Sequence, residues 1–249
     1  MREIDRSLIV KISQEPVGCG TFGQCFLARY RNITAVVKEM KRRNNTFKEG
    51  ERCKLEVFHE ANVLHSLGDH AGLPFHLGIC TEQEPYCLVL QFHCCGEESL
   101  TLHKGIKRRL LNKASTVGTF KDICGTLEYI HGKGFLHNDL KSNNVLLEAK
   151  RDGFRPIIID FGKSGPTEKE KGYKQSYGAE YIAPEVKKGH KQSCASDVYS
   201  FGKMLETAVR NRSFASLFSN IISKATAFSP ALRPSVGEIF TQLANAAHK

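Results

Sequence analysis

The chain has 249 residues, of which 41% are hydrophobic, and its formal net charge is +10. This length allows a sizeable buried core, in one domain or in two closely joined lobes. No apolar stretch reaches the length of a transmembrane helix, and the first residues lack the apolar core of a secretion signal. We therefore expect a cytoplasmic protein, or alternatively a nuclear one, without a membrane partner.

Neither the cysteines nor the positive charge indicates a specific site. Nine cysteines in a chain without an export signal are expected to be reduced thiols, and none has the Cys-x-x-Cys spacing typical of zinc ligands. Three basic runs could attract anions, but no aromatic residues interleave with them as base stacking would require. These runs are Lys41–Arg43, Lys107–Arg109 and Lys187–Lys188. We interpret them as solvated faces and expect no nucleic-acid partner.

Short strand-like segments dominate the first ninety residues. They are β-branched or alternating, and Gly, Asn, Pro or charged residues bound them at 8–13, 24–29, 33–40, 77–80 and 86–92. One helical pattern interrupts them. Apolar residues recur at helical spacing from Val57 to Leu67, with Glu and Lys on the opposite side, and predict a helix over residues 51–67.

Helical patterns prevail after residue 97. One helix is predicted to end near Gly132, and two more cover residues 197–210 and 236–247. Between them, Asp152-Gly153 is a tight-turn signal, and segments 145–148 and 156–160 flank it as a hairpin. The sequence therefore predicts an α+β fold with two lobes. The small β-rich lobe covers residues 1–92, and the larger, mainly helical lobe covers residues 93–249.

Gly18, Gly20 and Gly23 form a Gly-x-Gly-x-x-Gly string. A dinucleotide-binding loop of this type is followed by a helix, whereas residues 24–29 have a strand pattern. Two strands joined by a glycine loop are the arrangement that places backbone amides over nucleotide phosphates. A Walker A loop is excluded because no Gly-Lys-Ser/Thr ends the string.

Three further strings follow in a fixed order: HNDLKSNN at residues 137–144, DFG at 160–162 and APE at 183–185. Each string alone is a weak signal. Together they supply what phosphoryl transfer from ATP to a hydroxyl requires. One carboxylate must orient the hydroxyl, and an Asn and a second carboxylate must hold Mg²⁺ on the phosphates.

On these strings the chain resembles the protein kinase superfamily over about residues 10–245, and most closely the tyrosine-kinase-like serine/threonine kinases. The resemblance implies transfer of the γ-phosphate of ATP to Ser or Thr hydroxyls of protein substrates. Lys141 favours Ser/Thr over Tyr acceptors, because tyrosine kinases usually lack a lysine there. Tyrosine or dual specificity is one alternative, and a pseudokinase that uses the fold for docking is another.

The resemblance also implies roles for single residues. Asp139 would orient the acceptor hydroxyl and accept its proton, and Lys141 would neutralise charge on the moving phosphate. Lys38 would bind phosphates, with Glu60 as its partner. Glu56, one turn earlier on roughly the same helix face, is the competing partner.

The nucleotide and its metal would be held by other positions. Asn144 and Asp160 would ligate Mg²⁺, with Mn²⁺ as an alternative. The glycine string would cover the phosphates. The residues expected to surround adenine are Cys25, Val36, Leu90, Gln91, His93 and Leu146, with Leu90 as gatekeeper and 91–93 as the hinge.

Architectural residues complete the resemblance. Glu185 and Arg233 would form the ion pair that anchors the activation segment, and Asp197 would be the buried carboxylate that holds the catalytic loop. Asn138 stands where many kinases have an Arg that pairs with an activation-segment phosphate. We therefore expect phosphorylation at Thr167, Tyr173, Ser176 or Tyr177 not to switch activity through this pocket. Gly178 stands where serine/threonine kinases usually have a Thr that contacts Asp139 and Lys141.

Overall fold

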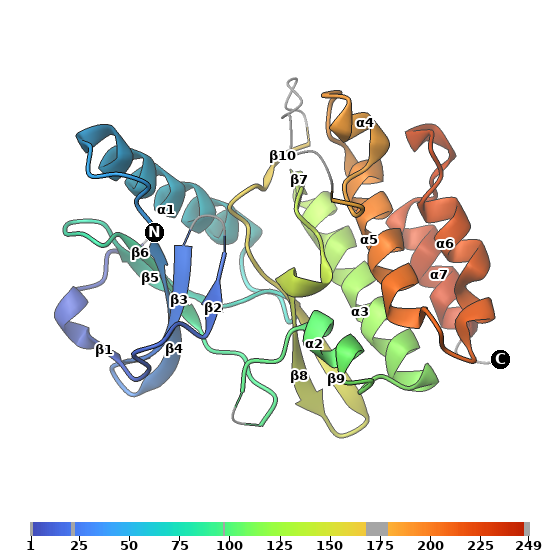
Figure 1. The fold of residues 1–249 in the computed structure, drawn as a ribbon, viewed down its shortest axis with the longest axis horizontal. Coiled ribbons are helices and arrows are strands. Elements are labelled where there is room, and N and C mark those ends of the chain that lie inside the picture. Colours follow the sequence, from blue (N-terminus) through green and yellow to red (C-terminus); the bar gives the residue numbers. More distant parts are fainter. Residues whose placement is uncertain (1, 21–22, 97, 168–178, 247–249) are drawn as a thin grey trace. The chain divides into compact units, whose positions relative to one another are not determined.

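The computed structural model describes residues 2–20, 23–96, 98–167 and 179–246 (Figure 1). The chain divides into two compact units, residues 1–93 and 94–249. The first unit is built on a β-sheet and the second is mainly helical, so the predicted α+β fold class is confirmed. Among the described residues, no helix combines the length and the apolarity needed to cross a bilayer.

The first unit contains one antiparallel sheet with the strand order β1-β3-β4-β6-β5, and β2 pairs with β3. A 3-10 turn, η1 (Arg6–Leu8), precedes it. The strands are β1 (Ile9–Lys11), β2 (Gly18–Cys19), β3 (Gly23–Tyr30), β4 (Ile33–Met40), β5 (His76–Cys80) and β6 (Cys87–Gln91). One sheet face carries a core cluster, in which Ala28, Ala35, Val37 and Val89 are at most 1% exposed.

Helix α1 (Phe47–Leu67) packs along β4, β5 and β6. The apolar spacing predicts a start at residue 51, but the helix begins at Phe47. The Thr46 side chain accepts a hydrogen bond from Glu49 N and caps the helix one turn earlier. The added turn carries the exposed Phe47 and therefore gives no amphipathic signal. The helix ends at Gly68, whose φ of 72° favours glycine.

The second unit contains six α-helices among its described residues. They are α2 (Leu102–Lys107), α3 (Lys113–Gly132), α4 (Pro184–Lys187), α5 (Cys194–Val209), α6 (Ser219–Ala225) and α7 (Val236–Ala246). Short 3-10 turns are η2 (Ser142–Asn144), η3 (Ala215–Phe218) and η4 (Pro230–Leu232). The strands form two pairs: β7 (Phe135–Leu136) with β10 (Gly165–Pro166), and β8 (Val145–Lys150) with β9 (Gly153–Ile158).

Helix α3 lies at the centre of this unit, in contact with α5, α7 and β9 (Figure 1). Its apolar residues Phe120, Ile123, Leu127 and Ile130 recur at helical spacing and are at most 1% exposed. The Phe120 ring meets the ring of Phe201 on α5 edge-on at 5.6 Å. This apolar stripe explains both why the segment is helical and why its neighbours pack around it.

The β8–β9 hairpin confirms the predicted turn with a shift of register. The sequence pattern places the turn at Asp152-Gly153, but Gly153 pairs with Lys150, so the loop consists of Arg151 and Asp152. Gly153 has a φ of 129°, which a residue with a side chain rarely adopts. Glycine is therefore favoured at the first position of β9 rather than in the turn.

A buried ion pair joins α4 to the segment that precedes α7. Arg233 makes a bidentate contact with Glu185, with Nη1–Oε1 at 2.7 Å and Nη2–Oε2 at 2.8 Å, and its side chain is 0% exposed. Ser196 of α5 donates a hydrogen bond to Glu185 at 3.0 Å. Although burial disfavours the Glu185 carboxylate, the Arg233 guanidinium lowers its pKa below the ordinary value.

We predict that Arg233→Ala destabilises the domain by about 3–5 kcal/mol, because it leaves a buried carboxylate without its cation. Urea unfolding followed by circular dichroism measures this change. Arg108→Ala is the matched control, since Arg108 pairs with Glu98 while both side chains are about half exposed. Equal stability losses for the two variants would contradict the prediction.

Candidate functional site

One face of the N-terminal sheet collects the residues predicted to bind nucleotide. Directly opposed residues of antiparallel strands point to the same side of a sheet. Cys25 opposes Lys38, and Val36 opposes Leu90, on the face opposite to the core. Cys25 and Val36 are only partly buried. The result is an apolar, partly exposed surface with an ammonium group at one end, which suits an aromatic base attached to phosphates.

The ammonium group of Lys38 is held in place by Glu60. Lys38 Nζ lies 2.7 Å from Glu60 Oε2, and the two side chains are 10% and 2% exposed. Glu56, the competing partner, instead contacts Arg52. The structure therefore brings the strand lysine to Glu60 of α1.

The glycine string forms a hairpin between β2 and β3. Gly18 opposes Cys25, and Gly20 N donates a hydrogen bond to Gly23 O at 2.9 Å. A Cβ on Gly23 would lie 2.3 Å from the carbonyl oxygen of Glu39, so this position requires glycine. Because a strand follows the string, a dinucleotide-binding turn into a helix is excluded. Thr21 and Phe22 lie outside the described residues.

The predicted hinge lies where the first unit ends. Gln91 is the last residue of β6, and its N–H donates to Phe75 O at 2.9 Å. His93 is 7% exposed. Leu146, the remaining adenine candidate, lies on β8 in the second unit and is partly buried.

In the second unit, the carboxylate of Asp139 is the centre of a hydrogen-bond network. Asp139 lies in the loop between β7 and η2 and is 3% exposed. Its Oδ2 accepts from Lys141 Nζ at 2.9 Å and from Asn144 Nδ2 at 3.3 Å. Its Oδ1 accepts from Lys163 Nζ at 3.1 Å and from Tyr181 Oη at 3.0 Å. Two of these donors, Lys163 and Tyr181, are not among the predicted site residues.

The charge of Asp139 alters the pKa of its neighbours. Burial disfavours the Lys141 ammonium, but its hydrogen bond to Asp139 raises the pKa of Lys141 above the ordinary value. Burial and then the Asp139 charge raise the pKa of the Tyr181 hydroxyl. Both groups therefore keep their protons at neutral pH and act as donors.

The predicted metal ligands lie on adjacent segments. Asn144 Nδ2 donates to the Asp139 carbonyl oxygen at 2.9 Å, and Asn144 O accepts from Ile159 N at 2.9 Å, next to Asp160 in the chain. This network leaves the amide oxygen of Asn144 for a cation. Within the described part of the chain, no group of three or more His, Cys, Asp or Glu side chains could hold a metal. The oxygen donors of Asn144 and Asp160 fit Mg²⁺, which is commonly shared between one or two carboxylates and substrate phosphates.

A buried carboxylate anchors the loop that carries Asp139. Asp197, in the first turn of α5, is 1% exposed and accepts from His137 N at 2.8 Å and from Asn138 N at 2.9 Å. His131 Nε2 lies 3.0 Å from the same carboxylate. Asp197 thus holds the backbone of the two residues that precede Asp139.

The His131–Asp197 contact is an ion pair. Burial is the largest single influence and disfavours the charged imidazole, but the interactions of His131 with Asp197 and Cys194 together exceed it and raise the pKa of His131 to about 9. Burial disfavours the Asp197 carboxylate as well, and the His131 hydrogen bond lowers the pKa of Asp197 below its ordinary value. Both groups are therefore charged at neutral pH.

Asn138 connects the loop to the segment after Asp160. Its Nδ2 donates to Lys163 O at 3.1 Å, and its backbone has a φ of 64°.

Among the predicted phosphorylation positions, Thr167 is described by the structure, and its N–H donates to Gly134 O at 2.9 Å. The other predicted phosphorylation positions, Tyr173, Ser176 and Tyr177, lie outside the described residues, as does Gly178.

The contacts of Lys163 and Tyr181 with Asp139 could not be predicted from the sequence, for a physical reason. The two residues lie on either side of residues 168–178, and only the folded path of the chain brings both to Asp139. Neither is marked by a local pattern. Their places directly after Asp160-Phe161-Gly162 and shortly before Ala183-Pro184-Glu185 are the only sequence signals that could have suggested them.

A strand–glycine loop–strand hairpin and an anchored Asp-Lys-Asn loop are the elements of a phosphotransferase. The sequence profile of the protein kinase domain matches residues 12–240. The chain therefore belongs to the protein kinase domain family.

Relatives in this family differ in their stated acceptor. The mitogen-activated protein kinase kinase kinase dlk-1 of Caenorhabditis briggsae is 29% identical over 206 residues, covering 82% of this chain and 22% of that protein. The human tyrosine-protein kinase TXK is 30% identical over 210 residues, covering 82% and 36%. The serine/threonine/tyrosine-protein kinase HT1 of Arabidopsis thaliana is 30% identical over 188 residues, covering 75% and 47%. The chain spans less than half the length of each.

We predict that His131 makes the stability of the domain pH-dependent. A pKa raised from 6.5 to about 9 on folding contributes stability that is complete below 6.5 and is lost as the pH rises through 9. His131→Gln should therefore destabilise the protein by about 1–3 kcal/mol at about pH 6 and by much less at about pH 10.

Urea unfolding across this pH range provides the measurement. His190→Gln, at an exposed site, controls for the removal of an imidazole elsewhere on the surface. A His131→Gln effect that stays constant with pH would mean that His131 is neutral in the folded protein.

Proposed function

We propose that this domain transfers the γ-phosphate of Mg-ATP to Ser or Thr hydroxyls of protein substrates. The observation that carries the proposal is the geometry around Asp139. Its carboxylate is buried and hydrogen-bonded to Lys141 and Asn144, on a loop whose backbone is held by Asp197. A fixed carboxylate beside a lysine is suited to orienting a hydroxyl and neutralising charge on a phosphoryl group.

Each residue has a separate task in this reaction. Asp139 would accept a hydrogen bond from the acceptor hydroxyl and take its proton as the new P–O bond forms. Lys141 would interact with the γ-phosphate oxygens. Lys38, held by Glu60, would bind phosphate oxygens of ATP. Asn144 and Asp160 would hold Mg²⁺, which supplies positive charge to the phosphate oxygens when bound.

The Ser/Thr preference rests on Lys141. The relatives include proteins named as tyrosine-specific and as serine/threonine/tyrosine kinases. Tyrosine or dual specificity is therefore the second candidate. A peptide array that presents Ser, Thr and Tyr in matched contexts separates the candidates.

The acceptor hydroxyl needs a place on Asp139. A carboxylate offers about four lone-pair positions, and Lys141, Asn144, Lys163 and Tyr181 supply four donors. One donor must leave before a substrate hydroxyl can bind. Tyr181 is the neutral hydroxyl among them, so its bond is weaker than those of the two ammonium groups. It is also the donor that a substrate hydroxyl resembles. We propose that the substrate takes the position of the Tyr181 hydroxyl.

We predict that Asp139→Asn and Lys38→Met each reduce phosphate transfer by roughly 10²–10⁴-fold, because each removes a charge that acts on the transition state. Radiolabelled ATP with a generic basic protein substrate provides the assay. The matched controls are Asp69→Asn and Lys48→Met at exposed positions.

Thermal melting must show that both variants remain folded. Full activity in either variant would overturn the assignment. If the wild-type domain binds ATP but transfers no phosphate to any substrate, the pseudokinase alternative replaces it.

We predict that Tyr181→Phe raises kcat/KM for a peptide substrate by roughly 2–10-fold, the equivalent of one hydrogen bond that the substrate no longer has to displace. The KM for ATP should not change. Tyr129→Phe on α3 is the matched control. A lower kcat with Tyr181→Phe would show instead that the hydroxyl positions Asp139.

A further inference from the structure

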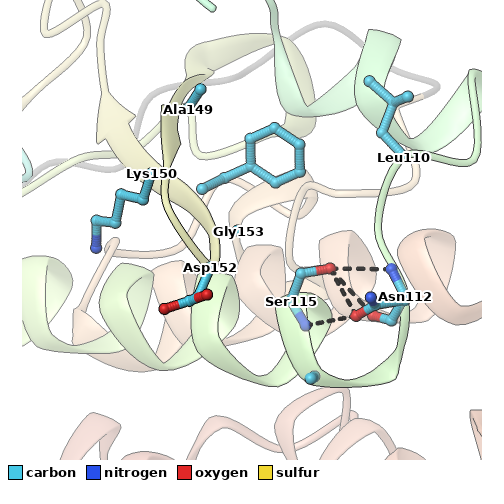
Figure 2. Close-up of a pocket in the computed structure, with 9 residues that line it drawn as sticks. Leu110, Asn112, Ser115, Ala149, Lys150, Asp152 and Gly153 are labelled. Carbon is cyan, nitrogen blue, oxygen red and sulfur yellow. Dashed lines mark hydrogen bonds between the residues drawn. The ribbon is translucent and has the colours of Figure 1, made fainter.

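A cavity of about 570 Å³ opens on the second unit, and Asp139 is not among the residues that line it. The start of α3 and the β8–β9 turn form its walls (Figure 2). Leu110, Asn112 and Ser115 lie on one side, and Ala149, Asp152 and Gly153 lie on the other. None of the predicted site residues lines this cavity.

The walls of the cavity offer mainly apolar surface. Leu110 is 44% exposed, and Phe154 is also part of the lining. The polar groups of Asn112 and Ser115 already bond to each other: Ser115 N donates to Asn112 Oδ1 at 2.8 Å, and Asn112 N donates to Ser115 Oγ at 2.9 Å (Figure 2). Leu110 on one wall and Phe154 on the other supply side chains for apolar contact with a ligand.

The residues next to the lining carry an excess of positive charge. Some nearby cations have carboxylate partners, since Arg108 pairs with Glu98 and Lys150 pairs with Asp122. Within the described ranges, no carboxylate lies at ion-pair distance from four others: Lys107, Arg109, Lys113 and Arg151. Against these four cations, the lining contributes the carboxylate of Asp152. The surroundings of the cavity are therefore complementary to an acidic ligand.

Lys113 adds a second argument for an acidic ligand. It is the first residue of α3, and the first turn of this helix contains no acidic residue. A helix N-terminus carries partial positive charge, so an acidic residue there stabilises a helix and a lysine does not. A carboxylate brought by a partner would interact favourably with both the lysine and the helix end.

We propose that this surface binds an acidic peptide segment of a partner protein, with one apolar side chain in the cavity. The apolar side chain would contact Leu110 and Phe154, and flanking carboxylates would meet Arg109, Lys113 and Arg151. An apolar wall between cations favours a peptide over a nucleic acid, whose backbone offers charge without an aliphatic side chain. The basic run Lys107–Arg109, interpreted from sequence as a solvated face, would then be part of a docking surface.

Fluorescence polarisation with labelled peptides tests the proposal on the full chain. The probe is EDELEDE, the matched probe EDESEDE lacks the leucine, and a short single-stranded DNA is the polyanion control. We expect EDELEDE to bind about tenfold more tightly than EDESEDE, as burial of one leucine side chain predicts. Binding should weaken with increasing salt.

Variants locate the binding surface. The double variant Arg109→Glu, Lys113→Glu should weaken EDELEDE binding by at least about tenfold, because two attractions become repulsions. Leu110→Ser should weaken EDELEDE binding and leave EDESEDE binding unchanged. Lys191→Glu, an exposed charge reversal elsewhere on the same unit, is the control and should have no effect. Melting temperatures establish that the variants are folded.

Four outcomes would overturn the proposal. They are absence of EDELEDE binding at millimolar peptide, equal binding of the two peptides, tighter binding of the DNA, and an equal effect of Lys191→Glu and the double variant. Because the readout is binding without ATP, these outcomes do not depend on whether the domain transfers phosphate.

Discussion

The hydrogen bonds that the buried Asp197 carboxylate accepts are the interactions on which the candidate site residues of the second unit depend. This carboxylate comes from α5 and accepts hydrogen bonds from two consecutive backbone N–H groups, those of His137 and Asn138. Two backbone bonds to one carboxylate fix the direction of the chain just before Asp139. His131 supplies the compensating charge, so that a carboxylate 1% exposed can remain ionised. The position of Asp139 is therefore set by the packing of α5 against α3 rather than by the loop alone.

In the N-terminal unit, the candidate nucleotide-binding residues lie on one of the two faces of the sheet. One face carries the core cluster around Val37, while the other leaves Val36 and Cys25 partly exposed near the ammonium group of Lys38. A buried lysine would be costly without a partner, and Glu60 of α1 provides one at 2.7 Å. Strand alternation and one ion pair therefore suffice to build a surface that is apolar at one end and charged at the other.

Most elements of the fold follow from patterns within the sequence. The long strands β3 and β4 and the helices α3, α5 and α7 have clear periodicity, because each has one face in a core. Helices α2, α4 and α6 contain six, four and seven residues. Segments so short complete too few turns for apolar spacing to be recognised. Their positions depend on tertiary contacts.

Some of the candidate site residues could likewise be predicted from the sequence, and others could not. Lys38, Glu60, Asp139, Asn144 and Asp160 could be proposed because each belongs to a motif or stands at a characteristic spacing from one. Lys163 and Tyr181 could not, because their contacts with Asp139 join residues that are 24 and 42 positions apart in the chain. The turn between β8 and β9 is a local example. The residue types indicate a turn near Gly153, but only the pairing of β8 with β9 fixes its register.

The backbone of Asn138 determines which side chains this position of the loop accepts without strain. Its φ of 64° lies in the left-handed region, which asparagine tolerates better than residues with longer side chains. An arginine here would add backbone strain and would lose the hydrogen bond from the Asn138 side chain to Lys163 O. Asparagine thus stabilises this loop conformation, and an arginine would need a new partner, such as a bound phosphate, to offset the lost hydrogen bond and the added strain.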